Sequence, residues 1–281
     1  MEVVRIGDAP PQPFPDGGGR PLSGIRVADL TRVIAGPVCG RTLASHGADV
    51  LRIAAPHLHS VAPLVVDTGL GKRSAHVDLR GQEGREKLRK LVLQADVFVN
   101  GYRPGALAAH GFSPQEVARL RPGIVYTTLS AYGHAGPWRE WRGFDSLTQS
   151  ASGIVHEGTT ASGGEEPRPL PCQALDHATG YLAAFGAMVA LKRRAEEGGS
   201  WMVRVSLAQT GRWLESLGRV QGGLDIHDPA PGDVKDFMQR RDSPFGELSH
   251  VAPPAILSKT PAHWALPPVP LGSHEAVWDT P

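Results

Sequence analysis

Residues 25–53 read IRVADLTRVIAGPVCGRTLASHGADVLRI, and this stretch decides the fold class. Ile25–Leu30 is a short, mostly apolar run of the kind that forms a buried strand. A Gly-Pro pair, which is tolerated at a helix start, precedes a predicted helix over Val38–His46 that Gly47 ends. Ala48–Ile53 is predicted to be the next strand. A strand, a helix and a second strand in succession indicate a βαβ unit with parallel strands.

The same alternation continues along the chain. Strands are predicted at Ser74–Leu79, Ala95–Val99, Ile124–Leu129 and Trp201–Leu207, and helices at Glu83–Gln94, Pro114–Leu120, His177–Arg194 and Ala208–Val220. Strands that alternate with helices favour a mostly parallel sheet with right-handed crossovers. We therefore predict an α/β protein with a Rossmann-like, mostly parallel sheet flanked by helices.

The two ends of the chain differ in composition from its middle. Residues 1–20 are rich in Pro and Gly, so we expect an irregular lead. Residues 21–220 carry all the predicted strands and helices and form one domain. Residues 221–281 are rich in Pro, His and Gly with little periodicity, which predicts an extended tail that wraps the surface or a partner.

Composition excludes several classes of protein. The chain has 281 residues, with 29 Lys and Arg against 28 Asp and Glu, so its formal net charge is +1. A near-neutral balance predicts neither a nucleic-acid partner nor a polybasic membrane surface. The apolar stretch Tyr181–Leu191 is too short for a membrane span, and two cysteines cannot build a disulfide framework. We expect a soluble, reduced, cytoplasmic protein.

Common cofactor motifs are missing from the first strand–helix turn. The turn Val33–Gly40 lacks the Gly-x-Gly-x-x-Gly spacing that lets a backbone approach a pyrophosphate. The sequence also contains no P-loop and no Gly-x-Ser-x-Gly elbow. His57 and His59 have no supporting ligand at a useful spacing, so we predict no metal site.

Six short blocks in succession carry a more specific signal. They are PLSGIRVADLTRVIAGP (21–37), GADVLRI (47–53), GKRS (71–74) with Asp78-Leu79, ADVFVNGYRPGAL (95–107), YGHAGP (132–137) with GFDSLTQSASG (143–153), and LDHATG (175–180). In this order they resemble the family III CoA-transferases, also called the CaiB/BaiF family. The resemblance extends over residues 21 to about 210.

The resemblance implies a reaction and its nucleophile. The family transfers CoA from an acyl-CoA donor to a carboxylic acid acceptor through an aspartate, and the matching position here is Asp176. A carboxylate that attacks a thioester gives a mixed anhydride and releases CoA thiolate, which splits one hard exchange into easier steps. No metal or permanently bound cofactor is implied, and CoA enters as a substrate. Asp176 also precedes a predicted helix, where an N-cap role is equally natural and can coexist with the nucleophilic one.

The resemblance also implies residues along the bound CoA. These candidates are Arg32, Val33, Lys72, Arg73, Tyr102 and Arg103. Lys72 and Arg73 are the better candidates for the phosphates, because two adjacent cations in a Gly-flanked loop suit an anion. For each cation the alternative is an ordinary solvated loop side chain.

Several positions depart from the family pattern. Ala54 and Ala55 stand where an acidic and often a basic residue follow the second strand, and His110 falls where an Arg is common. Two expected CoA contacts are therefore absent. The α-methylacyl-CoA racemases of the family carry a His beside the Asp of the fifth block, whereas Phe144 precedes Asp145 here. A racemase reading is weaker, since a two-base proton exchange loses one partner.

Family members are also longer than this chain. They carry a small second domain after the position of Val220, whereas the last residues here resemble the family's own C-terminus. We therefore expect a chain that lacks the small domain at its usual place. The resemblance implies an interlocked homodimer, or a partner chain that supplies the small domain. The alternative to a transferase is a non-catalytic or incomplete subunit.

Overall fold

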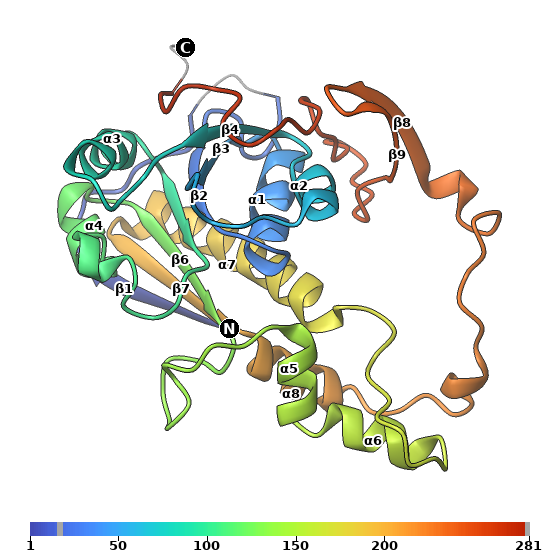
Figure 1. Cartoon of the computed structure of the whole chain (residues 1–281). Helices are drawn as coiled ribbons and strands as arrows, with labels where there is room; N and C mark the ends of the chain where they lie inside the picture. The colour runs from blue at the N-terminus through green and yellow to red at the C-terminus, as the bar shows by residue number, and fades with distance from the viewer. Residues whose placement is uncertain (16–18, 279–281) are drawn as a thin grey trace.

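Seven strands form the central sheet, in the order β1-β7-β6-β5-β2-β3-β4 (Figure 1). They are β1 Glu2–Gly7, β2 Arg26–Leu30, β3 Asp49–Ala54, β4 Lys72–His76, β5 Val97–Asn100, β6 Val125–Ser130 and β7 Ser200–Ser206. All neighbouring strands run parallel except β1, which pairs antiparallel with β7. The predicted α/β class is confirmed. The computed structural model describes residues 1–15 and 19–278.

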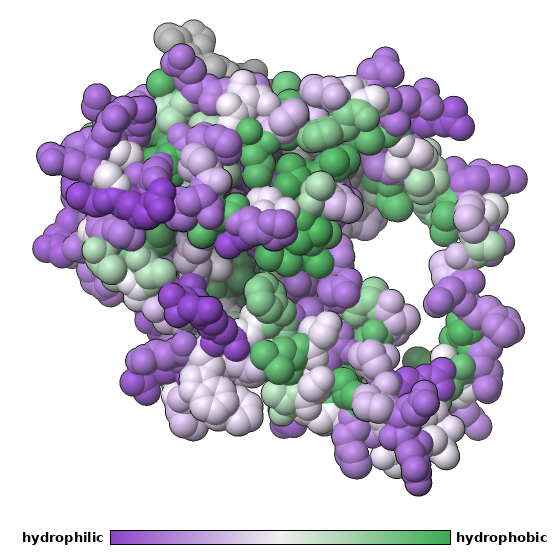
Figure 2. Space-filling view, in the orientation of Figure 1, coloured by the Kyte–Doolittle hydropathy of each residue, from purple (hydrophilic) through white to green (hydrophobic). Residues whose placement is uncertain are grey.

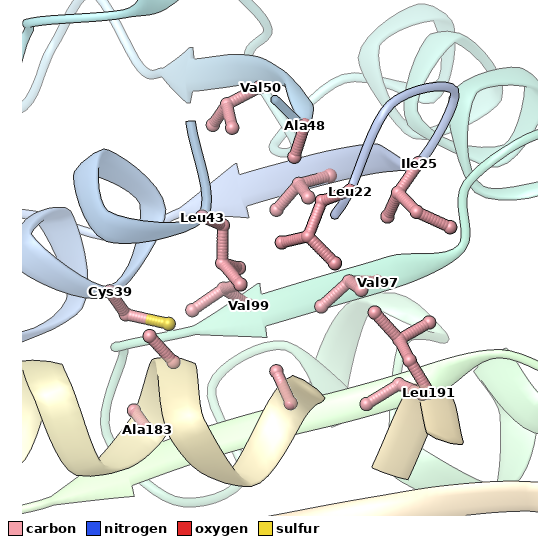
Figure 3. Close-up of a cluster of buried hydrophobic side chains, with 14 of the residues drawn as sticks. Leu22, Ile25, Cys39, Leu43, Ala48, Val50, Val97, Val99, Ala183 and Leu191 are labelled. Carbon is pink, nitrogen blue, oxygen red and sulfur yellow. The ribbon is translucent and has the colours of Figure 1, made fainter. Parts of the chain in front are cut away.

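Helices cover both faces of this sheet (Figure 1). Helices α1 and α7 pack on one face, and α3 and α4 pack on the other. The bounds are α1 Ala35–Ser45, α2 Ala62–Thr68, α3 Gln82–Val92, α4 Pro114–Leu120 and α7 Ala174–Glu197. Side chains alternate across a strand, so Val97 and Val99 of β5 face α1 and α7 while Phe98 faces the other layer. Figure 3 shows the first of these two cores, with Leu43, Val99 and Ala183 converging between helices and strands.

Small residues bring α1 and α7 unusually close. A Cβ placed on Gly180 would lie 2.5 Å from the carbonyl oxygen of Ala35 and 2.7 Å from the Val38 Cβ. Only glycine fits such an approach of two backbones. The first turn of α1 therefore lies against the second turn of α7.

Helix α7 is the central helix of the core. Among the described residues it is the one helix whose length and composition would allow it to cross a membrane, and 56% of its apolar window is buried inside the protein. Its Ala183, Ala184 and Ala187 pack against α1 and the sheet. Its apolar character is explained by this burial.

Element starts differ from the prediction in a way that matters for the site. Helix α1 begins at Ala35 rather than Val38, and α7 begins at Ala174 rather than His177. Strand β4 begins at Lys72, two residues before the predicted start. Local patterns locate an element better than its first residue, since caps and tertiary contacts set the boundary.

The prediction of an irregular lead over residues 1–20 is wrong for Glu2–Gly7. This segment forms β1 and pairs with β7, with Glu2 opposite Arg204 and Val3 opposite Val203. An edge strand needs only one apolar face, so its short alternating pattern was masked by the Pro-rich residues after it. Residues 16–18 of the predicted lead lie outside the described residues.

The tail over residues 221–281 contains more structure than predicted. Most of it is irregular, but β8 (Met238–Ser243) and β9 (Gly246–Val251) form a hairpin. Only two residues, Pro244 and Phe245, join the strands, and Gly246 follows with a φ of +98°. A short turn followed by a glycine in the left-handed region is a common hairpin connection. Residues 279–281 lie outside the described part of the chain.

After the hairpin, the tail returns to the α/β layers. Trp264 is buried against α1 and its indole Nε1 donates to the carbonyl of Arg41 at 2.9 Å. Trp278 is buried in the opposite layer and donates from Nε1 to the carbonyl of Leu91 at 2.9 Å. The tail thus completes both hydrophobic cores instead of forming one of its own.

Three helices form an arm that projects below the sheet (Figure 1). They are α5 (Asp145–Ala151), α6 (Ile154–Ala161) and α8 (Leu207–Ser216). Neither α5 nor α6 was predicted, because both are short and lack a strong apolar stripe. Helix α5 places its first residue beside the start of α7, which positions the candidate active site.

Candidate active site

Asp176 lies in the first turn of α7 and only 7% of its surface is exposed. The residue at the N-cap position is Gln173, and its own side chain makes no capping hydrogen bond. The N-cap role predicted for Asp176 is therefore wrong, because the helix begins three residues earlier than its apolar pattern indicates. Asp176 is a buried carboxyl group at the positive end of a long helix.

A second carboxylate holds this turn in place. Asp145 is 1% exposed, and its Oδ2 accepts a hydrogen bond from the backbone N–H of Asp176 at 2.8 Å. Its Oδ1 accepts from Nε2 of Gln149 at 2.5 Å. Gln149 also accepts from the Leu170 N–H at 2.8 Å and donates to the Cys172 carbonyl at 3.3 Å. The loop before α7 is thereby tied to α5.

The two carboxyl groups give the site its electrostatics. Burial, and then the negative charge of Asp145, raise the pKa of Asp176 to about 7. These effects outweigh the helix N-terminus, which favours a carboxylate. Burial, followed by the charge of Arg41, lowers the pKa of neighbouring His177, so its imidazole stays neutral at pH 7. Asp176 can change its charge at neutral pH, which suits a nucleophile.

The carboxyl ends of β2, β3 and β5 form the second part of the site. Arg32 and Val33 occupy the turn between β2 and α1, and Arg32 donates from Nη2 to the carbonyl of His59. Val33 has a φ of +70°, and it is the one non-glycine residue with positive φ in the described ranges. A β-branched residue in this region is strained, and such strain concentrates at functional sites. Because Gly180 packs on Ala35, this turn lies next to the start of α7.

A pocket of about 120 Å³ opens beside the same strand ends. Its lining is mostly apolar and includes the basic side chains of His57, Arg80 and His110. The lining residues are Leu30, Ile53, Ala54, Ala55, His57, Leu58, Val77, Leu79, Arg80, Tyr102, Ala106, Leu107 and His110. Tyr102, a predicted CoA contact, is part of this lining, whereas Arg103 is exposed in the following loop. Nδ1 of His57 lies 3.8 Å from Oδ1 of Asp78. A flat apolar ring with anionic groups would suit this pocket.

Lys72 and Arg73 do not lie on a loop, which corrects the prediction. They are the first two residues of β4, and both side chains are already ion-paired. Lys72 is 1% exposed and its Nζ lies 2.7 Å from Oδ2 of Asp29 and from the carbonyl of Pro37. Arg73 pairs with Asp49 at 2.8 Å. Lys72 ties β4 to β2 and to α1, and Arg73 ties β4 to the neighbouring β3, so neither ion pair leaves its cation open to a phosphate.

Replacing Lys72 by methionine should lower the free energy of unfolding by about 3–5 kcal/mol, because Asp29 would stay buried without its partner. Urea unfolding measures the loss. The exposed Lys192, which pairs with Glu196 one helical turn away, gives the matched Lys-to-Met control and should change little. If Lys72 instead bound a CoA phosphate and had no structural role, the variant would keep its stability and bind CoA more weakly.

Sequence reasoning missed three groups that define the site. Asp29 and Arg52 lie on neighbouring strands at the same register position, and both are buried. The signal was a charged residue inside each of two otherwise apolar strand patterns. Gln149 gave no local signal, because two of its three partners, Leu170 and Cys172, lie 21 and 23 positions away along the chain.

Together, the fold and the site define an α/β protein with a mostly parallel sheet, a buried pair of carboxyl groups at a helix start, and a mostly apolar pocket at the strand ends. Comparison with known proteins makes this class more specific. The model of CoA-transferase family III matches residues 22–224, and the chain belongs to this family.

Named relatives agree with this assignment. The chain is 37% identical over 240 residues to the acetyl-coenzyme A transferase nodX of Hypoxylon pulicicidum, covering 84% of this chain and 39% of that protein. It is 31% identical over 183 residues to the succinyl-CoA:glutarate CoA-transferase of Homo sapiens, covering 61% of this chain and 41% of that one. The chain spans about half the length of the curated relatives it matches.

Solved structures share the fold. A structure of Rv3272 from Mycobacterium tuberculosis superposes with a TM-score of 0.79 at 21% identity, covering 92% of this chain and 98% of that chain. A CAIB/BAIF family protein from Brucella suis superposes with a TM-score of 0.64 at 27% identity, covering 81% of this chain and 65% of that chain. The α/β architecture is therefore that of the family.

Proposed function

We propose that this protein transfers CoA from an acyl-CoA donor to a carboxylic acid acceptor, with Asp176 as the nucleophile. The observation that carries this proposal is the buried Asp176 carboxyl at the start of α7, hydrogen-bonded through its backbone to Asp145, in a chain that belongs to CoA-transferase family III. Several relatives are named as transferases that use succinyl-CoA and a second acid, which supports the general reaction.

The proposed reaction needs no nucleophile from the protein other than Asp176. A carboxylate oxygen of Asp176 attacks the thioester carbonyl, the C–S bond breaks, and a mixed anhydride forms as CoA thiolate leaves. The thiolate then attacks the aspartyl carbonyl, which releases the donor acid and leaves an aspartyl thioester. The acceptor carboxylate displaces CoA from this thioester. The freed thiolate attacks the acceptor acyl carbonyl, giving the new acyl-CoA and regenerating Asp176.

CoA would lie along the carboxyl ends of the strands, between the pocket and Asp176. In this arrangement Tyr102 contacts the nucleotide in the pocket, and Arg32 and Val33 form the turn that the CoA crosses to reach α7. Open α/β sheets bind ligands at this edge in general. Arg103, the exposed residue after Tyr102, would meet a CoA phosphate in this arrangement. Lys72 and Arg73 would act indirectly, by fixing the strands.

The active form is proposed to contain a second copy of the chain or a partner chain. Large apolar side chains are exposed on and after the arm, including Phe144 at 63%, next to Asp145, together with Leu217, Val220 and Ile226. Exposed apolar groups on this scale mark an interaction surface. Residues 217–237 connect the arm to the hairpin without packing into the α/β layers, and Figure 2 shows an opening beside this connection. Such an opening would accommodate a segment of an interlocked partner.

The proposal is tested by trapping the intermediate. The protein is mixed with a panel of acyl-CoAs, quenched with hydroxylamine, and analysed by intact mass and peptide mapping. Hydroxylamine converts an aspartyl thioester or anhydride to a hydroxamate, which we expect at Asp176. Free CoA with hydroxylamine gives the control. A folded protein that stays unmodified with every donor would contradict turnover by this chain alone, and would favour a subunit that requires its partner.

A further inference from the structure

The side-chain amide of Gln149 joins separate segments of the candidate active site. Gln149 lies on α5, one turn after Asp145, and only 2% of its surface is exposed. Its Nε2 donates to Oδ1 of Asp145 at 2.5 Å and to the carbonyl of Cys172 at 3.3 Å. Its Oε1 accepts from the N–H of Leu170 at 2.8 Å. Both amide hydrogens and the amide oxygen therefore have partners within the protein.

The chemistry of these partners fixes the direction of the amide. A carboxylate and a peptide carbonyl only accept hydrogen bonds, and a peptide N–H only donates. A flipped amide would place its oxygen against the Asp145 carboxylate and the Cys172 carbonyl, which are both acceptors. Glutamate has the same shape, but its ionised form has no hydrogen to donate to either group. Position 149 therefore requires an amide rather than a carboxylate.

The second oxygen of Asp145 carries this connection to the candidate nucleophile. Oδ2 of Asp145 accepts from the backbone N–H of Asp176 at 2.8 Å, so a chain of hydrogen bonds runs from Gln149 through Asp145 to the first turn of α7. A helix start leaves its first N–H groups without partners inside the helix. The side chain of Gln173, at the N-cap, makes no hydrogen bond to them. Asp145 supplies the acceptor for one of these groups in its place.

The same arrangement sets the electrostatics of Asp176. Burial, and then the negative charge of Asp145, raise the pKa of Asp176 to about 7. Arg41, on α1, acts instead on the neighbouring His177, whose pKa is lowered first by burial. Within residues 1–15 and 19–278, Gln149 is the one side chain that hydrogen-bonds to Asp145. An Asp145 side chain that turned away would leave Asp176 without its backbone acceptor and without the neighbouring like charge.

We propose that Gln149 is a positioning residue of the transfer reaction, which orients Asp145 and thereby holds the Asp176 carboxyl in place for attack on the thioester. The inference rests on the proposed function, and Gln149 acts through Asp145 rather than on the substrate. Its bonds to Leu170 and Cys172 fix the segment that leads into α7, so α5 and the start of α7 cannot move apart without breaking them. A displacement of about 1 Å at a reacting group can cost about 100-fold in rate.

The test compares Gln149→Met with wild type in steady-state transfer and in the pH dependence of hydroxamate labelling at Asp176. We expect kcat to fall about 10- to 100-fold while KM for the acyl-CoA changes less than about threefold, because the residue positions the nucleophile and does not bind substrate. The labelling rate of wild type should rise with a midpoint near pH 7. In the variant this midpoint should move down by about half a pH unit or more, because Asp145 is no longer held beside Asp176. Gln115→Met, at an exposed position of α4, is the matched control and should change neither quantity.

A double-mutant cycle tests whether Gln149 acts through Asp145. Asp145→Asn removes the charge and should move the midpoint in the same direction. Adding Gln149→Met to it should lower kcat by less than about threefold further, because both residues act along one path. Should Gln149→Met fold poorly, Gln149→Glu keeps the shape without the donated hydrogen bonds and is expected to lower kcat by a similar factor.

The possible outcomes separate this inference from the proposed function. A folded Gln149→Met variant with the wild-type kcat or the wild-type midpoint overturns the inference, as do losses that multiply in the double variant. A lower melting temperature as the only defect overturns it as well, since that is the result of a merely structural role. A wild-type protein that is labelled by no donor contradicts the proposed function instead.

Discussion

Replacing Asp176 by asparagine should reduce CoA transfer by about 1,000-fold or more, because an amide cannot attack the thioester and nothing else in the site replaces the carboxylate. The amide has the same shape and its backbone N–H still donates to Asp145, so the fold should be retained. The steady-state rate of transfer, with a donor that labels the wild-type protein, measures the effect. The hydroxamate at residue 176 should disappear together with the activity.

The matched control for this substitution is Asp228→Asn, at an exposed position in the segment after the arm. It changes the net charge by the same amount and should leave the rate unaltered. Transfer at near-normal rates in the Asp176 variant would show that another group is the nucleophile. A hydroxamate that still forms in this variant would likewise place the nucleophile at another residue, because an amide at position 176 cannot form the trapped intermediate.

The sheet was predictable because strands and helices leave different periods in the sequence. Buried parallel strands such as Val97–Asn100 are continuous apolar runs, and α4 was predicted with its exact bounds from Pro114 to Leu120. Edge strand β1 and short helix α5 were missed. Both depend on neighbours that lie far away in the sequence, and their own periods are too short to decide the assignment.

The candidate nucleophile was predictable for a different reason. Asp176 was identified from the block LDHATG, whose residues match a family pattern, and not from any local physical signal. Its surroundings were not predictable, because Asp145 lies 31 positions earlier and meets it only when α5 and α7 pack together. The proximity of the two carboxyl groups, and therefore the raised pKa, is a property of the tertiary structure.

The roles of the basic residues could not be predicted from the sequence either. In the sequence, Lys72 follows Gly71 and resembles a loop cation that is free to bind an anion. In the structure it reaches Asp29, 43 positions away, and is fully committed. Arg52 interrupts an apolar strand pattern in the sequence, and only the structure shows that its buried Nη1 has no hydrogen-bond partner among the described residues. A charge can be assigned to a ligand only after its intramolecular partners are known.

The same Asp176→Asn substitution should stabilise the protein, and more so as the pH rises. The pKa of Asp176 is about 7 in the folded protein and near the ordinary value of 3.8 in the unfolded chain, so the folded state holds an extra proton between these values. Stability contributed by this group is fully present below pH 3.8 and is lost as the pH rises to 7. The loss is about 1.4 kcal/mol per pH unit and reaches about 3–4 kcal/mol. Asparagine does not ionise and escapes this loss.

Urea unfolding at pH 5.5, 7 and 8.5 measures the difference between variant and wild type. We expect the advantage of the variant to grow by about 2 kcal/mol from pH 5.5 to 7 and to stay constant above it. Asp228→Asn, which removes a carboxyl group at an exposed position, is the control for this measurement. A difference that is the same at all three pH values would mean that Asp176 is not the group titrating near neutrality. Burial and the neighbouring Asp145 raise the pKa of Asp176, and both also destabilise the fold when Asp176 is charged. A trend of the expected size would therefore show that the ionised nucleophile lowers the stability of the protein.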